Sequence, residues 1–180
     1  VTTGPEKVLG ISMGKSDDNF ATFWESKLTK LKAKLDIWRQ RDLSFEGKSL
    51  LIKSLAVSQL LYSIEMKCVD KRIIQRADKL IFDFLWSGKR SPVNREVCYL
   101  PRDEAGLGIP NLESLVKVKR VQWIIRYLKE NSQQQWAKLI ENYLRCLDNK
   151  FGIFLFSLKV TDSSELTTAA QIPKFYKECI

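Results

Sequence analysis

The chain has 180 residues, of which 44% are hydrophobic and 28% are charged, and this balance is typical of globular proteins. It contains no histidine, which excludes histidine-dependent zinc sites and the Ser-His-Asp and Cys-His catalytic arrangements. The net charge is +9 and its positive excess belongs to the first two-thirds of the chain, so a polyanion such as nucleic acid is the expected partner.

The amino-acid sequence also shows no targeting signal and no closely spaced pair of cysteines. No apolar run reaches the roughly 20 residues that a membrane helix needs, and the first residues do not resemble a secretion signal. The four cysteines are too widely spaced for a common zinc site, so we expect free thiols in a reducing compartment. The sequence therefore predicts an intracellular protein with no membrane, metal or small-molecule partner. Because it begins without methionine, we expect a piece of something longer.

The first predicted elements are a short strand and a long amphipathic helix. Residues 6–14 alternate apolar and small side chains, which predicts a strand. Asp17, Asp18 and Asn19 can then cap a helix of about six turns. Its apolar residues recur every three or four positions, namely Phe20, Trp24, Leu28, Leu31, Leu35 and Trp38. Its other faces carry more cations than carboxylates, namely Lys27, Lys30, Lys32, Lys34, Arg39 and Arg41 against Glu25 and Asp36.

A second helix is expected to begin after Ser44, which can act as its cap. One apolar stripe is predicted along it, through Leu51, Leu55, Ser58 and Tyr62, and it is widened by Leu50, Val57 and Leu61. Gly47 costs this helix about 1 kcal/mol against alanine, so it either allows a ligand strand to approach, with its amide on a phosphate, or merely eases the turn. Lys48 and Lys53 lie where the helix dipole opposes cations, and an external anion would offset that.

Further helices fill the rest of the chain. A third is expected from Asp70 to Gly88, followed by an exposed connector that carries Lys89 and Arg90. Residues 96–101 read as extended, and the glycines after Ala105 predict a tight turn. Asn111 can cap a fourth helix with a basic outer side, and a fifth is expected over 131–147. Residues 151–160 fit a strand or a buried helical turn, and a further helical segment is expected to begin at Pro173.

Five pieces of sequence, taken in order, resemble the region that follows the palm in reverse transcriptases of LINE-type (non-LTR) retrotransposons. They are VLGI, KLTKLKAKLDIWRQRDLSFEGKSLLIKSLAVSQLLYS, FLWSGK, CYLPRDEAGLGIPNL and VQWIIRYL, and the resemblance covers about residues 6–129 in the family's order. PKFYKECI near the chain end also resembles a later segment of the family, in which an aromatic pair opens a helix. The resemblance implies a mostly α-helical, thumb-like bundle. It implies a palm tail over 1–14, a basic helical thumb over 15–130, and over 131–180 a connecting segment that the chain end truncates.

The resemblance also implies which roles are present and which are not. Val8, Leu9 and Gly10 take the position of the hairpin that grips the primer end, with valine in place of the family's aromatic residue. The adjacent Asp17 and Asp18 do not occupy the position of the catalytic aspartate pair. We therefore expect no catalytic or metal-binding residue in this chain, and Mg²⁺ would belong to a palm outside it.

The implied function is sequence-independent binding of a template-primer duplex through its phosphates, next to the remainder of a parent polymerase in the nucleus and cytoplasm. The candidate contacts are Lys30, Lys34, Arg39, Arg41, Gly47, Lys48, Lys53, Lys89, Arg90, Lys119 and Arg120. Two alternatives stay open. One is a helical protein-interaction module, and the other is a domain like that of an intron maturase, which would bind structured RNA.

Overall fold

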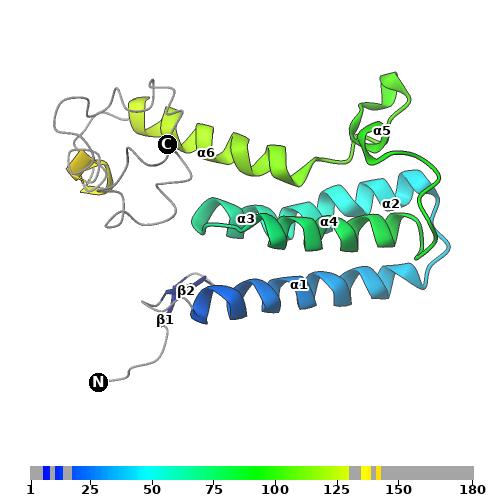
Figure 1. Ribbon diagram of the computed structural model, residues 1–180, viewed down its shortest axis with the longest axis horizontal. Helices are drawn as coiled ribbons and strands as arrows, with labels where there is room; N and C mark the ends of the chain where they lie inside the picture. Colours follow the sequence, from blue (N-terminus) through cyan, green and yellow to red (C-terminus); the bar gives the residue numbers. More distant parts are fainter. Residues whose placement is uncertain (1–5, 9–10, 14–17, 130–134, 139–140, 143–180) are drawn as a thin grey trace. The chain divides into compact units, whose positions relative to one another are not determined.

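The computed structural model describes residues 6–8, 11–13, 18–129, 135–138 and 141–142 (Figure 1). The elements are β1 (Glu6–Val8), β2 (Ile11–Met13), α1 (Asp18–Arg39), α2 (Phe45–Leu51), the π-helix η1 (Ile52–Val57), α3 (Ser58–Met66), α4 (Lys71–Leu85), α5 (Arg95–Tyr99), the 3-10 helix η2 (Arg102–Glu104) and α6 (Leu112–Lys129). The fold is therefore mostly α, which confirms the predicted class. The predicted N-terminal strand is an antiparallel pair, with Val8 opposite Ile11.

The chain divides into two compact units, residues 1–116 and 117–180, and the division falls within α6. In the first unit α4 packs against both α1 and α2 (Figure 1). The domain boundaries predicted from the sequence, after residues 14 and 130, stay a prediction.

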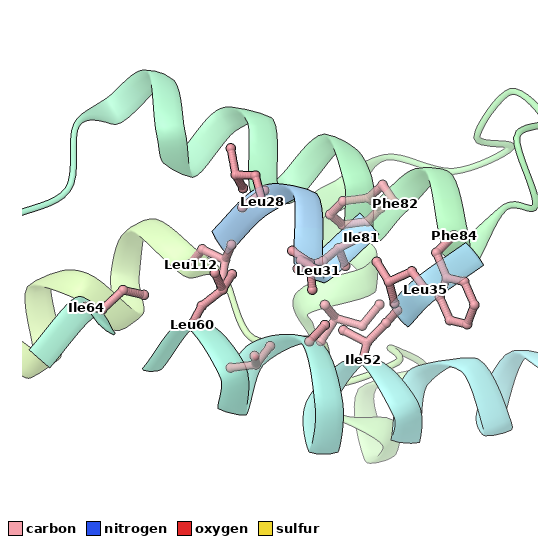
Figure 2. Packing of buried hydrophobic residues seen from close by; sticks show 14 of the residues in the cluster. Leu28, Leu31, Leu35, Ile52, Leu60, Ile64, Ile81, Phe82, Phe84 and Leu112 are labelled. Carbon is pink, nitrogen blue, oxygen red and sulfur yellow. The ribbon is translucent and has the colours of Figure 1, made fainter. Parts of the chain in front are cut away.

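The apolar stripe of α1 forms one wall of the core. Leu28, Leu31 and Leu35 are each no more than 3% exposed, and they point toward apolar side chains of η1 and α4 (Figure 2). Trp24 is also buried, and its indole N–H donates a hydrogen bond of 3.0 Å to the carbonyl oxygen of Cys68. The stripe predicted for this helix is confirmed, because leucines at helical spacing can be buried together only on one side.

The second helix runs from α2 through η1 into α3. The Ser44 hydroxyl caps it by accepting a hydrogen bond of 3.2 Å from the Gly47 amide, as predicted. The predicted stripe is wrong in part, since Ser58 and Tyr62 are exposed. The buried residues of this helix are Ser49, Ile52, Ala56, Val57, Leu60, Ser63 and Ile64, of which only Val57 belonged to the predicted stripe. Apolar residues occur on several sides of this helix, and the π-helical turn changes its phase, so hydrophobicity alone could not select the buried side.

The extended segment predicted near 96–101 is also wrong over most of its length. Residues 95–99 form α5, whose first turn is capped where the Asn94 side chain accepts a hydrogen bond of 3.4 Å from the Glu96 amide. Cys98 is buried on the inner side of this short helix. Within the described residues the β1–β2 pair is the one sheet, so no strand edge is there to pair with this segment. The strand or buried turn expected over 151–160 lies outside the described residues.

A tight turn follows α5 and is fastened to the second helix. The Gly108 amide donates to the carbonyl oxygen of Leu100 at 2.7 Å, and the Ser49 hydroxyl donates to that of Leu107 at 2.8 Å. A Cβ atom on Gly106 would lie 1.9 Å from the Leu100 carbonyl oxygen, and Gly108 has φ +61°. The turn predicted from the glycines is confirmed, and both glycines are required by its geometry.

The remaining helix ends follow the sequence signals. α4 begins after Asp70 and ends in a turn where Gly88 has φ +76°. The Asn111 side chain accepts a hydrogen bond of 3.0 Å from the Ser114 amide and so caps α6. Of the predicted fifth helix, residues 135–138 and 141–142 are helical, and the rest lies outside the described residues, as does the segment expected to begin at Pro173.

Candidate nucleic-acid interface

One side of α1 carries a row of cations, which we call the cationic flank. It consists of Lys27, Lys30 and Lys34, whose spacing of three and four residues aligns them along one side of the helix, and of Arg41 just beyond the helix end. Lys30, Lys34 and Arg41 are exposed and form no ion pair within the described part of the chain. Arg41 lies in the turn after α1, with its guanidinium 4.8 Å from the centroid of the Trp38 ring.

The carboxylates of α1 described in the structure lie on its other side, where α4 packs. Glu25 forms a salt bridge with Arg76 of α4. Asp36 lies 3.8 Å from Arg39, and Arg39 also binds Asp83 of α4 at 2.9 Å. Because Glu25 and Asp36 are about three helical turns apart, they share a side, opposite the cationic flank. The lysines of the flank, Lys27, Lys30 and Lys34, therefore have no described carboxylate of α1 among them, whereas Arg39 belongs to the neutralised side.

Lys67 extends the flank beyond α1. Its ammonium lies 4.4 Å from the centroid of the Phe23 ring, and the ammonium of Lys27 lies 5.3 Å from the same centroid. Burial lowers the pKa of both lysines, and the nearby charge of Lys30 lowers that of Lys27 further. Sequence reasoning did not select Lys27 or Lys67 as contacts. The three-residue step from Lys27 to Lys30 could have identified the first, but no local signal identifies Lys67.

Lys48 forms hydrogen bonds with other residues of this chain. Its ammonium donates to the Ser87 hydroxyl at 2.6 Å and to the carbonyl oxygen of Leu85 at 3.4 Å. A cation is favoured there, because these groups form the C-terminal end of α4. This explains the charge near the start of the second helix without an external anion. The Gly47 amide donates to the Ser44 hydroxyl within the protein, which argues against the phosphate contact that was one of the two alternatives for this residue.

Three further candidates lie elsewhere in the first unit. Lys53 is half-buried on η1, and its ammonium is 3.0 Å from where a Cβ atom on Gly108 would lie, so it covers the tight turn. Lys89 and Arg90 are exposed in the connector after α4, with no ion pair among the residues that the structure describes. These two are thus accessible to an external anion, whereas Lys53 is partly committed to the turn.

The last candidates fall at the two ends of the predicted region. Lys119 and Arg120 belong to the second unit, and Arg120 is only 4% exposed, which argues against direct contact with a phosphate. Val8 is the residue of β1 that pairs with Ile11. Leu9 and Gly10, the other residues of the predicted primer grip, lie outside the described residues.

Metal-binding clusters and membrane-spanning helices are both absent from the part of the chain that the structure describes. It contains no cluster of three or more histidine, cysteine or acidic residues that could hold a metal ion. None of its helices combines the length and the apolar character that crossing a membrane requires.

Comparison with known proteins gives two relatives, and no protein-family model matches the chain. The chain is 28% identical, over 97% of its length, to the uncharacterized 149 kDa protein of transposon TX1 from Xenopus laevis. It is 29% identical, over 68% of its length, to a putative ribonuclease H protein from Arabidopsis thaliana. The matched region spans 13% and 20% of these relatives. Both similarities are consistent with an origin in a retrotransposon.

Proposed function

We propose that this chain is the thumb region of a retrotransposon reverse transcriptase and holds a template-primer duplex through its phosphate backbone. The observation that carries the proposal is the cationic flank, whose three lysines on α1 have no described carboxylate of that helix among them. The similarity to a transposon-encoded protein over nearly the whole chain supports it independently.

The length of the flank suits a nucleic-acid strand. From Lys27 to Arg39, the last residue of α1, the helix rises about 18 Å, at about 1.5 Å per residue. Phosphates of one strand follow each other every 3.4 Å or so along a duplex axis, so this part of α1 can lie beside about five of them. Lysine and arginine bind phosphates without reading the bases, which is what a polymerase needs in order to copy any sequence.

In this proposal the chain positions its substrate and does not catalyse. The nucleotidyl transfer and the Mg²⁺ ions that support it belong to a palm elsewhere in the parent polymerase, acting in the nucleus or cytoplasm. The thumb contributes affinity and the alignment of the primer end, for which Val8 and its neighbours are the candidates.

The test compares two triple variants that each remove three positive charges. Lys30, Lys34 and Arg41 are replaced by alanine in the first. The control replaces three exposed cations that lie off the flank and have no ion pair in the described residues, namely Lys32, Arg72 and Lys79. Affinity for an RNA–DNA duplex is measured by fluorescence anisotropy across a salt series.

We expect the flank variant to bind more weakly, with a log–log salt slope shallower by up to about 3, because each phosphate contact contributes about 0.9. The control should change the slope much less. Equal effects of the two variants would mean that net charge alone causes binding, and would overturn the assignment to the flank. Tighter binding of structured RNA than of duplex would favour the maturase-like alternative, and no binding to either would favour the protein-interaction module.

A further inference from the structure

The start of α2 and the end of α4 lie at the same end of the first unit (Figure 1), and an aromatic pair, Phe45 and Trp86, lies there. Phe45, the first residue of α2, is 53% exposed. Its ring centroid lies 5.3 Å from that of Trp86, at an angle of 58° between the rings. Trp86 is half-buried and packs on the core, so it supports the Phe45 ring from the protein side. The pair forms a fixed apolar surface that solvent reaches.

The turn after α4 adds cations next to this surface. Ser87 has φ +52° and Gly88 has φ +76°, and the Lys89 amide donates to the carbonyl oxygen of Trp86 at 3.0 Å. Lys89 and Arg90 therefore follow Trp86 within one turn of the chain. Both are exposed and have no ion pair in the described residues. A surface with a ring for stacking and two accessible cations beside it matches the chemistry of one nucleotide.

Two carboxylates, one on α2 and one on α4, are engaged in other contacts. Glu46 lies 3.9 Å from Arg102, and Asp83 binds Arg39 at 2.9 Å. The ammonium of Lys48 lies 5.7 Å from the centroid of the Phe45 ring, so positive charge lies on the aromatic pair itself. An anionic group bound here would meet cations without a direct clash with these two carboxylates.

We propose that Phe45 and Trp86 form a stacking site for an unpaired nucleotide next to the duplex, with its phosphate on Lys89 and Arg90. The proposal rests on the proposed function and extends it to the single-stranded part of the template. Every base has a flat π face, so stacking on Phe45 tolerates any sequence, as copying requires. The cationic flank would then hold the paired region and the aromatic pair the first unpaired base.

The experiment measures the affinity of the whole chain for a blunt RNA–DNA duplex and for the same duplex with a short single-stranded extension of the template. The wild-type chain should bind the extended duplex at least about fivefold more tightly, the range expected for one stacked base. Phe45→Ala should lose that preference and keep its affinity for the blunt duplex, whereas Phe45→Tyr, which retains a π face, should keep the preference.

Leu50→Ala is the matched control, because Leu50 is a large apolar residue of the same helix and is 63% exposed but has no ring. Its preference for the extended duplex should be unchanged, and circular dichroism verifies that each variant is folded. Equal wild-type affinity for blunt and extended duplexes would overturn this inference and leave the proposed function intact. Loss of the preference in Leu50→Ala as well would also overturn it, and failure of the wild type to bind either duplex would overturn both proposals.

Discussion

Replacing Gly47 by alanine separates the helical role of this residue from a role in binding. Its φ is outside the left-handed range, and an added Cβ atom would lie 3.5 Å from the Ser44 hydroxyl oxygen and 3.8 Å from Leu43, which are ordinary contacts. Alanine therefore fits, and it should stabilise the protein by about 0.5–1 kcal/mol because glycine loses more backbone entropy on folding. The expected rise in melting temperature is about 2–6 °C, measured by circular dichroism.

If Gly47 is present so that a nucleic-acid strand can approach, the more stable Gly47→Ala variant should bind the duplex less tightly. Ala33→Gly is the matched control, since Ala33 is exposed within α1 and the reverse change should destabilise by about 1 kcal/mol. A variant that is stabilised but binds as the wild type does would show that Gly47 only eases the turn. Destabilisation by alanine would refute the steric reasoning itself.

Three further changes test the fold. Ser49→Ala should destabilise by about 1–3 kcal/mol in urea titrations, because the carbonyl oxygen of Leu107 loses its donor. Ala105 has φ +60°, so Ala105→Gly should raise stability by roughly 1 kcal/mol in the same titration, and a lower stability would contradict that strain. Burial raises the pKa of Asp78 to about 6, with Arg95 opposing the shift. The folded state therefore holds this proton up to a higher pH than the unfolded state, so the contribution of Asp78 to stability is lost as pH rises from about 4 to 6. Asp78→Asn should abolish that part of the pH dependence, which thermal melts across this range would detect.

Much of the fold follows from local sequence. The leucine spacing in α1, the caps at Ser44 and Asn111 and the glycines of the tight turn each fix a nearby piece of backbone, because their effects reach only three or four residues. The buried side of the second helix was predicted wrongly at Ser58 and Tyr62. Several sides of this helix are apolar, so the neighbouring elements decide which side is buried. The prediction of an extended segment at α5 was wrong for the same reason, because a short apolar run can form a helix or a strand depending on its surroundings.

Composition and short-range spacing were enough to predict the helical class, most helix ends and the excess of positive charge. Which cations face outward together depends on how the helices pack. This packing directed Arg39 to Asp83 and Lys48 to the end of α4, and left Lys30, Lys34 and Arg41 along one open flank. Pairing between charges depends on distances between residues far apart in the chain, and only the packed helices set those distances.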